Sequence, residues 1–374
     1  MKLVIVSNYI NHHQTALCEE LNRLAGGSFA FIETEEMSEE RLAMGWDDSA
    51  GELSYVVKGY AYPYEMRDLI RDADCVIFGG AEDEELIVPR LEAGKFTIRY
   101  SERLYKEGRW KFITPKGLMK KYHDHIRFRK SNAYLLCAGA YVAGDYRLIG
   151  AYPKKKFKFG YFPAVYEYAD VHEKRRDNDK LNILWAARFI DWKHPEVMVF
   201  LARELKKAGI PFNITMIGEG DLFKKTRGFA KHLDVSDKIT FTGAKTPEEV
   251  RERMLSSDIF VVTSDRLEGW GAVVNEAMNS GAVVMAPRQI GAAPYLINNT
   301  VNGFLYNATD YRQLFDIIDG LYKDKDKMLE IGSKAYETMV KSWNAKVAAQ
   351  RLWEFIEDPR HKISDYKEGP MSRA

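Results

Sequence analysis

Two glutamates, Glu268 and Glu276, stand eight positions apart in the stretch LEGWGAVVNEAMNSG, residues 267–281. Two neighbouring carboxylates can act as the acid and base of a glycoside hydrolase if their carboxyl groups lie about 5–9.5 Å apart. Eight residues at the helical rise span roughly 12 Å, which is too far for that role. The spacing instead fits a ligand that carries hydroxyl groups at both of its ends.

The glycines between these glutamates indicate where such a ligand would be held. DIFVVTS, residues 258–264, predicts a strand, and a helix is expected to begin near Gly269–Gly271 and to end near Asn279. The first amides of a helix have no partners within it and attract phosphate. We therefore expect the backbone of a donor-binding segment to hold a diphosphate, and this segment consists of Gly269, Trp270, Gly271 and Ala272. Glu276 would accept hydrogen bonds from ribose hydroxyls, and Glu268 from sugar hydroxyls. The alternative is that both glutamates are ordinary surface carboxylates.

A diphosphate requires positive partners, and LWAARFIDWKHPE supplies Arg188 and Lys193 between a strand and a helix. Arginine can bind phosphate oxygens through two parallel hydrogen bonds, and lysine supplies a point charge. Two further strand exits, MIGEGD and FTGAKTPEE, carry the other expected donor contacts: Gly218, Glu219, Thr242 and Gly243. Solvated loop residues, and an ordinary helix start after Thr242-Gly243, are the alternative interpretations.

Short apolar strands and helices alternate along the chain, which predicts two doubly wound α/β domains with parallel sheets. The expected domains are 1–165, joined by a C-terminal helix at about 350–374, and 175–349. A hydrophobic fraction of 46% is ample for two cores, and a net charge of +1 argues against a general nucleic-acid binder. Cys18, Cys75 and Cys137 are widely spaced, which favours a reduced, cytoplasmic protein.

The order of these motifs resembles the retaining glycosyltransferases of GT-B fold, the family that includes sucrose synthases and bacterial mannosyltransferases. The likeness extends over about residues 180–310, and the two glutamates with seven residues between them are its most specific part. The resemblance implies two facing Rossmann-like domains, with the donor held mainly by the second. It also implies catalysis without a metal or other cofactor, in which Arg188 and Lys193 stabilise the departing diphosphate and Glu268 lies beside the transferred sugar.

The chain departs from the family pattern at four places. His194 follows Lys193 where glycine is common, and Pro294-Tyr295 stands where a Pro-Glu pair is common. The first loop, SNYINHHQ, lacks the usual glycines, and FTIRYSERLYK lacks the usual histidine. Ser101, Glu102 and Arg103 are candidates to replace that histidine, and the expected acceptor or sugar contacts of the first domain are Asn8, His12, His13 and Glu102. For the two histidines, helix capping and surface exposure are equally good interpretations.

A basic segment, residues 103–130, holds ten Lys or Arg against Glu107 and Asp124, with aromatic residues between them. Such segments are attracted to anionic lipid surfaces, whereas a solvated basic face is the alternative. We expect a hexosyltransferase that moves sugar from a nucleotide donor, with UDP as the expected nucleotide, to a glycan or polyprenyl-linked acceptor of a surface polysaccharide. It would be cytoplasmic or peripheral on the inner face of the plasma membrane. An epimerase or phosphorylase of the same fold and a non-catalytic nucleotide-sugar binder are the competing functions.

Overall fold

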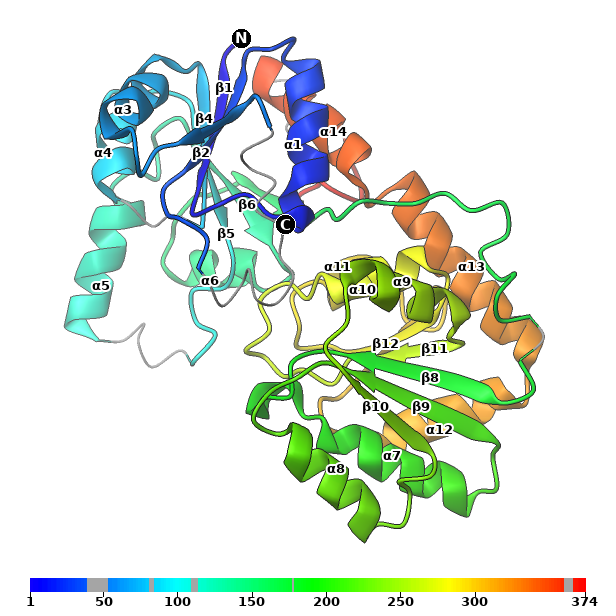
Figure 1. Cartoon of the computed structure of the whole chain (residues 1–374). Helices are drawn as coiled ribbons and strands as arrows, with labels where there is room; N and C mark the ends of the chain where they lie inside the picture. The colour runs from blue at the N-terminus through cyan, green and yellow to red at the C-terminus, as the bar shows by residue number, and fades with distance from the viewer. Residues whose placement is uncertain (39–52, 81–83, 109–113, 177, 360–365) are drawn as a thin grey trace. The chain divides into compact units, whose positions relative to one another are not determined.

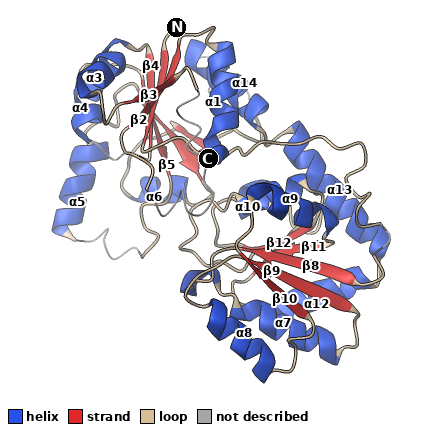
Figure 2. Ribbon diagram, viewed as in Figure 1, coloured by secondary structure: helices blue, strands red, loops and turns tan. Residues whose placement is uncertain are grey.

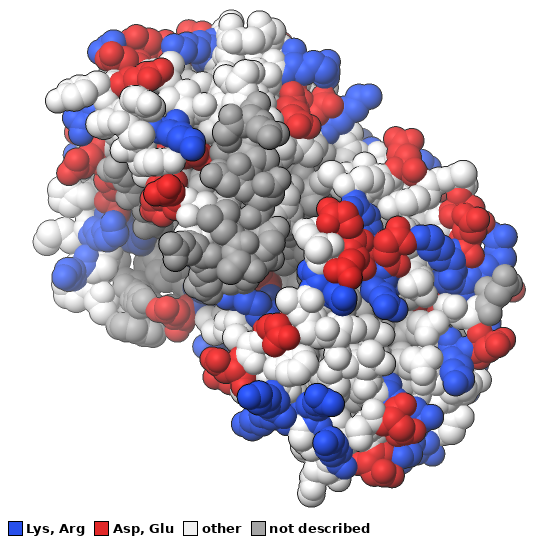
Figure 3. Space-filling view, viewed as in Figure 1, with Lys and Arg blue, Asp and Glu red and all other residues white. Residues whose placement is uncertain are grey.

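The computed structural model describes residues 1–38, 53–80, 84–108, 114–176, 178–359 and 366–374. The chain forms two compact units, one of Met1–Ala164 with Trp343–Ala374 (unit 1) and one of Val165–Ser342 (unit 2). From the sequence, the chain was expected to pass from the first domain to the second between residues 165 and 175, and to return near residue 349. Within the described ranges, no helix is both long and apolar enough to cross a bilayer. Lys and Arg are mixed with Asp and Glu on the face shown in Figure 3.

Unit 1 contains a parallel sheet in the order β3-β2-β1-β4-β5-β6-β7 (Figure 1). Its strands are β1 (Leu3–Ser7), β2 (Phe29–Glu33), β3 (Val56–Lys58), β4 (Cys75–Gly79), β5 (Thr97–Ser101), β6 (Ala133–Ala138) and β7 (Lys156–Phe159). Its helices are α1 (His12–Leu24), α3 (Pro63–Asp72), α4 (Glu84–Glu92), α5 (Pro115–Lys121), the π-helix η3 (Tyr122–Ile126), α6 (Val142–Leu148) and α14 (Ala345–Glu357). Helices cover both faces of this sheet (Figure 2), which explains why β1, β2, β4 and β6 are buried along their whole length.

Unit 2 contains a second parallel sheet in the order β10-β9-β8-β11-β12-β13. Its strands are β8 (Leu181–Ala186), β9 (Phe212–Ile217), β10 (Ile239–Gly243), β11 (Ile259–Val261), β12 (Val283–Pro287) and β13 (Phe304–Tyr306). Its helices are the 3-10 turn η4 (Asp191–Lys193), α7 (Glu196–Lys207), α8 (Phe223–His232), α9 (Pro247–Ser256), α10 (Val273–Asn279), α11 (Ala293–Leu296), α12 (Tyr311–Tyr322) and α13 (Lys325–Lys341). Both sheets are doubly wound, as the sequence predicted.

Each sheet reverses its strand order at one point. The chain runs outward from β1 through β2 to β3 and then returns to β4 on the other side of β1. Unit 2 repeats this pattern at β8 and β11. In open α/β sheets, ligands bind beyond the carboxyl ends of the strands at such a switch point. The loops after β1 and β4, and those after β8 and β11, are therefore the places to look for a site.

The C-terminal helix belongs to unit 1, as expected, but it spans Ala345–Glu357 and not about 350–374. The helical tail of the sequence breaks at Ser342–Asn344, and Asn344 caps α14 by accepting a hydrogen bond from the amide of Val347 at 2.9 Å. α14 then packs beside α1 (Figure 1), and its Phe355 lies 4.9 Å from Phe157, ring centre to ring centre. The tail thus supplies one helix to each unit, α13 to unit 2 and α14 to unit 1.

Candidate active site

Lys193 and Glu268 form an ion pair across the switch point of unit 2. Lys193 ends η4 in the loop after β8, and Glu268 lies in the loop after β11, 75 residues further along the chain. Their side chains are only 13% and 14% exposed, and the Lys193 ammonium also lies 4.3 Å from the centre of the Trp192 ring. The structure therefore joins two of the three residues that the sequence suggested for catalysis.

Buried hydrogen bonds hold the backbone beneath this pair. The hydroxyl of Thr263, just after β11, donates to the carbonyl of Lys193, and the indole of Trp185 in β8 donates to the same hydroxyl at 2.8 Å. The Asp265 amide donates to the Trp192 carbonyl at 3.0 Å. Because Thr263 and Trp185 are each about 1% exposed, water cannot easily replace these bonds. The two loops are thus fixed to each other and to the sheet.

The backbone conformation of His194 explains why histidine can stand where the family usually has glycine. Its backbone lies in the left-handed region, with φ 47° and ψ 54°, where glycine carries no steric penalty. Histidine is among the few other residues that are enriched there. Its ring nitrogens lie 3.4 Å from Asp265 Oδ2 and 3.2 Å from Glu196 Oε1, so the side chain has polar partners on both sides. The usual glycine is replaced, but the conformation that favours glycine is kept.

Arg188 lies at the same edge of the sheet, in the loop directly after β8. Its side chain is exposed and forms no ion pair with any residue in the described part of the chain. The neighbouring Ala187 and Phe189 are tied to the loop after β9 through the bonds Ala187 N–H to Ile217 O at 3.1 Å and Phe189 N–H to Glu219 O at 2.8 Å. A fixed backbone thus presents a guanidinium whose charge is available to a ligand.

Gly218 and Gly220 make this close approach of two loops possible. A Cβ atom on Gly218 would lie 2.0 Å from the carbonyl oxygen of Ala187, and one on Gly220 would lie 2.5 Å from that of Phe189. Both residues have positive φ angles, 133° and 144°. The neighbouring backbone lies where a side chain would be at either glycine, so both residues let the Arg188 loop pack against the loop after β9. The expected donor contact of Gly218 stays a prediction.

The exit of β10 lies beside the same loops. Thr242 directs its hydroxyl to the carbonyl of Gly243 at 3.0 Å, and the Gly218 amide donates to that carbonyl at 2.9 Å. A Cβ on Gly243 would lie 2.8 Å from Oε1 of Glu219, whose side chain is exposed. The four residues expected at the second and third strand exits therefore form one local group.

The segment between the two glutamates differs from expectation in one respect. α10 begins at Val273, and the side chain of Trp270 is buried, 1% exposed, with its indole donating to Asn275 Oδ1 at 2.9 Å. The Trp270 side chain therefore packs inside unit 2, which leaves the backbone of residues 269–272 and the Ala272 methyl group for a ligand. Gly271, with φ 88°, lies against Glu268, whose Cγ would be 3.4 Å from an added Cβ.

Glu276 lies in the first turns of α10 and is partly buried. Burial raises the pKa of Glu276 to about 7, while the positive charge of Arg251 lowers it. Arg251, on α9, also lies over the ring of Tyr166, 3.9 Å from its centre. Sequence reasoning missed Arg251, because a lone arginine inside an ordinary charged helix carries no signal.

In unit 1, Asn8, His12 and His13 follow β1 at the switch point, and Glu102 follows β5. Asn11 caps α1 by accepting from the His13 amide at 3.0 Å, and the His13 ring is stacked on Tyr161 at 6.4 Å between ring centres. Tyr161 donates its hydroxyl to Glu102 Oε1 at 2.8 Å. Asn8 follows β1 and accepts from the Ser7 hydroxyl at 3.2 Å, while the neighbouring His12 is exposed.

A cavity of about 30 Å³ lies next to these residues, which is room for a water or two. Its lining combines the polar Ser7, His13, Gln14 and Tyr161 with apolar side chains of β1, β4, α1 and α14. His13 and Tyr161 thus form part of the cavity wall, and Glu102 is bound to that wall through the Tyr161 hydroxyl.

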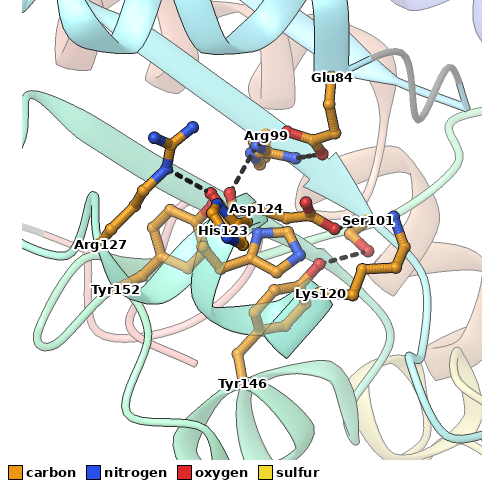
Figure 4. A network of polar contacts seen from close by, with 10 residues as sticks. Glu84, Arg99, Ser101, Lys120, His123, Asp124, Arg127, Tyr146 and Tyr152 are labelled. Carbon is orange, nitrogen blue, oxygen red and sulfur yellow. Dashed lines mark hydrogen bonds and ion pairs between the residues drawn. The ribbon is translucent and has the colours of Figure 1, made fainter. Parts of the chain in front are cut away.

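A network of polar contacts supports β5, the strand that Glu102 follows (Figure 4). Arg99 in β5 binds Glu84 through two bonds of 2.7 and 2.8 Å and donates to the carbonyl of Asp124 in η3 at 2.8 Å. At the end of β5, the Ser101 hydroxyl accepts from Tyr146 at 3.0 Å and donates to the Glu102 carbonyl at 2.8 Å.

Arg103, the third candidate to replace the family histidine, lies apart from this network. Its Nε is 3.4 Å from Oδ2 of the buried Asp145, and its guanidinium lies 4.9 Å from the centre of the Tyr141 ring. These contacts occupy Arg103 within unit 1, whereas Glu102 stays beside the cavity wall.

The known proteins that this chain resembles are glycosyltransferases. The family model "Glycosyl transferases group 1" matches residues 169–338, most of unit 2. A GDP-mannose-dependent α-(1-6)-phosphatidylinositol monomannoside mannosyltransferase of Mycobacterium tuberculosis is 22% identical over 92% of this chain and 94% of its own. The amylovoran biosynthesis glycosyltransferase AmsK of Erwinia amylovora is 29% identical over 49% of this chain and 47% of its own.

Solved structures share the architecture of the whole chain. HepE of Anabaena, crystallised with UDP, superposes with a TM-score of 0.71 at 14% identity and covers 96% of this chain and 100% of its own. WaaG, a glycosyltransferase involved in lipopolysaccharide biosynthesis, gives a TM-score of 0.62 at 12% identity over 95% and 100% of the two chains. Two Rossmann-like domains with these neighbours define a GT-B fold. The chain is a glycosyltransferase, and its residues 169–338 are similar to the group 1 family.

Proposed function

We propose that the chain transfers a hexose from a nucleotide sugar to a glycan or polyprenyl-linked acceptor in surface polysaccharide synthesis, with retention of anomeric configuration and without a metal or other cofactor. The observation that carries the proposal is the meeting of Lys193 and Glu268 at the switch point of unit 2, with Arg188 exposed at the same edge. Cations at that edge suit a diphosphate, and carboxylates suit the hydroxyls on either side of it.

In the proposed reaction, the bond between the sugar and the diphosphate breaks while the acceptor oxygen bonds to the same carbon from the same face. Negative charge then develops on the departing phosphate. Arg188 and Lys193 stabilise that charge from loops whose backbone is held in place by hydrogen bonds. A donor phosphate oxygen takes the acceptor proton. Two cations supply the charge that a divalent ion would otherwise provide.

Glu268 has a second role in this proposal. Its carboxylate orients Lys193, and a donor phosphate competes with Glu268 for the ammonium. When Lys193 turns to the phosphate, the Glu268 carboxylate can accept hydrogen bonds from sugar hydroxyls. Glu276, eight residues on, binds the ribose. The proposed contacts with the nucleotide base, at Thr242 and Gly243, lie at the end of β10.

The nucleotide is the first point to test. UDP is the nucleotide that we expect, and HepE was crystallised with UDP. The mycobacterial relative, in contrast, is GDP-mannose-dependent. Binding of UDP, GDP and their sugar conjugates, measured by thermal shift and calorimetry, identifies the donor. NMR of the product then reports the anomeric configuration, and the assay is repeated with EDTA. An inverted product would refute retention, and loss of activity with EDTA would refute metal independence.

We also propose that the enzyme works in the cytoplasm at the inner face of the plasma membrane, where polyprenyl-linked acceptors are found. Transfer of labelled sugar to lipid extracts tests the acceptor class, because a soluble glycan acceptor would leave the label in the aqueous phase. The comparisons and the site offer no observation that favours the epimerase, the phosphorylase or the non-catalytic binder.

A further inference from the structure

Three exposed tyrosines follow β3 within a short stretch of the chain. Tyr60, Tyr62 and Tyr64 are 37%, 60% and 86% exposed. Single apolar side chains are common on protein surfaces, but aromatic rings that are exposed as a group indicate a binding surface. None of these side chains forms a hydrogen bond or a ring contact with the described part of the chain. The rings and their hydroxyls are therefore available to a ligand.

The backbone beneath these rings is fixed. The amides of Ala61 and Tyr62 both donate to the Lys58 carbonyl, at 3.0 and 3.1 Å, and α3 begins directly after Tyr62. Gly59 packs so closely under this turn that an added Cβ would lie 2.7 Å from Cγ2 of Ile32. A fixed backbone lowers the entropic cost of binding a ligand, which suits the turn to recognition.

Glu33, at the end of β2, connects this turn with the loop after β1. Its carbonyl accepts from the Tyr60 amide at 3.2 Å, and its buried carboxylate accepts from the Ile10 amide at 2.9 Å. The Glu35 amide donates to the Asn8 carbonyl at 2.9 Å. Because β3, β2 and β1 are neighbours in register, the ends of β3 and β1 lie about 10 Å apart, roughly the length of a disaccharide. The tyrosines thus lie near the loop that carries the expected acceptor residue Asn8.

The charge around the tyrosines favours an uncharged ligand. Residues 33–38 and 58–68 contain only Lys58 and Arg67 as cations, against five acids: Glu33, Glu35, Glu36, Glu65 and Asp68. Glu35, Glu36 and Glu65 are exposed and form no ion pair with any described residue. Excess negative charge repels phosphate and anionic lipid headgroups, whereas carboxylates accept hydrogen bonds from hydroxyl groups. A neutral sugar chain matches both features, since its C–H groups pack on aromatic rings and its hydroxyls donate to carboxylates.

We propose that Tyr60, Tyr62 and Tyr64 bind the glycan part of the acceptor, with the sugar residues behind the acceptor hydroxyl packed on these rings. The inference rests on the proposed function and narrows its acceptor to an uncharged oligosaccharide. Successive rings can hold successive sugars without lying in one plane. The flat ring is the required feature, because an aliphatic side chain lacks the negative face on which C–H groups pack.

Affinity electrophoresis of the full chain tests this surface without a sugar donor. The gels contain mannan, dextran or galactan, which are uncharged polysaccharides, and we expect slower migration in at least one of them than in a plain gel. Tyr62→Ala with Tyr64→Ala should abolish this retardation, and so should the corresponding leucine pair. Tyr62→Phe with Tyr64→Phe keeps the rings and should retain it. Tyr62 forms no side-chain cap on α3, so these changes should leave the melting temperature unchanged.

The matched control is Tyr122→Ala on η3, which removes another exposed tyrosine, 53% exposed, and should migrate like the parent. Kinetics with the acceptor found in lipid extracts then connect the surface with catalysis. The alanine pair should raise the KM for this acceptor about tenfold and leave kcat and the donor KM unchanged. Glycan released from the same extract by mild acid should inhibit transfer by the parent, and phosphatidylcholine vesicles should not.

A parent chain that none of the polysaccharides retards, or an alanine pair with the parent's acceptor KM, would overturn the proposal. Inhibition by the vesicles and not by the released glycan would assign the rings to a membrane and would overturn it as well. Failure of the proposed function gives a different result. The parent would then transfer sugar to no acceptor, while retardation in the gels and its loss in the alanine pair would still show the sugar-binding surface.

Discussion

The ammonium of Lys193 and the carboxylate of Glu268 neutralise each other between the loops that follow β8 and β11, with both side chains largely buried. The pair joins the two strands at which the sheet reverses its order. It is therefore both a structural link in unit 2 and the point where an incoming phosphate would compete for positive charge.

Removing one member of this pair should cost more stability than removing both. Lys193→Met leaves a largely buried carboxylate without its cation, whereas Lys193→Met with Glu268→Gln leaves neither charge. We expect a coupling energy of about 0.5–3 kcal/mol from a double-mutant cycle measured by calorimetry. The exposed pair Lys245–Glu249 is the control, with an expected coupling of about 0.3–0.5 kcal/mol. Equal coupling in the two cycles would contradict the structural role.

Arg188→Ala should lower kcat/KM by about 100–1000-fold, as the loss of one stabilising group at a developing charge typically does. The melting temperature should not change, because the side chain is exposed and forms no ion pair with described residues. Arg227→Ala on α8 removes another exposed arginine and should leave kcat/KM unchanged. Steady-state kinetics with the identified donor decide the matter. Parent-like turnover of Arg188→Ala would exclude the arginine from catalysis.

His194→Gly should be tolerated and His194→Val should not. Glycine adopts the left-handed conformation without strain, while a β-branched residue is a steric outlier there. We expect the glycine variant to remain within about 1 kcal/mol of the parent and the valine variant to lose about 1–2 kcal/mol. Thermal denaturation measures both. A valine variant as stable as the glycine variant would show that the backbone at 194 can relax.

Gly218→Ala should destabilise unit 2 by more than about 2 kcal/mol, because the new Cβ would overlap the carbonyl of Ala187. The Arg188 loop must then move, so activity should fall with stability. Gly228→Ala, inside α8, adds a Cβ that meets nothing within 4 Å and should stabilise the helix by about 1 kcal/mol. Calorimetry and kinetics on both variants test the claim. A stable and fully active Gly218→Ala chain would refute it.

The stability of the chain should depend on Glu276 between pH 4.5 and 7. Burial raises the pKa of Glu276 from 4.5 to about 7, so the folded state favours the protonated carboxyl. Its stabilising contribution is complete at low pH and is lost as pH rises towards 7. We therefore expect the melting temperature of Glu276→Gln minus that of the parent to increase as pH rises from 4.5 to about 7. Arg251→Gln should move this pH dependence of stability to higher pH, because Arg251 lowers the pKa of Glu276. A difference in melting temperature that does not change with pH would contradict the burial of Glu276.

Much of the fold could be predicted because the deciding signals are local. Continuous apolar runs such as VIFG in β4 and ILWA in β8 identify strands buried on both faces. β3, with only three half-buried residues, gives no such run. The π-helix η3 and the break at Ser342–Asn344 were not predicted either, since tertiary contacts and a single asparagine cap determine them.

The sequence predicted which loops form the candidate site. It did not predict the contacts between their side chains. Strand exits place Arg188, Lys193 and Glu268 at one edge, but the pairing of the last two depends on β8 and β11 being neighbours. The burial of Trp270 depends on Asn275, which the sequence shows only as another polar residue in a helix. The catalytic and binding roles of these residues stay predictions.

The return of α14 to unit 1 has a consequence for the order in which the chain matures on the ribosome. Residues 1–164 emerge first, yet they lack the helix that covers α1 and Phe157 until the last part of the chain has been synthesised. Residues 165–342 form a contiguous unit and are complete earlier. The second half can therefore finish folding before the first, and a nascent chain stalled near residue 342 would expose an unfinished apolar surface to chaperones.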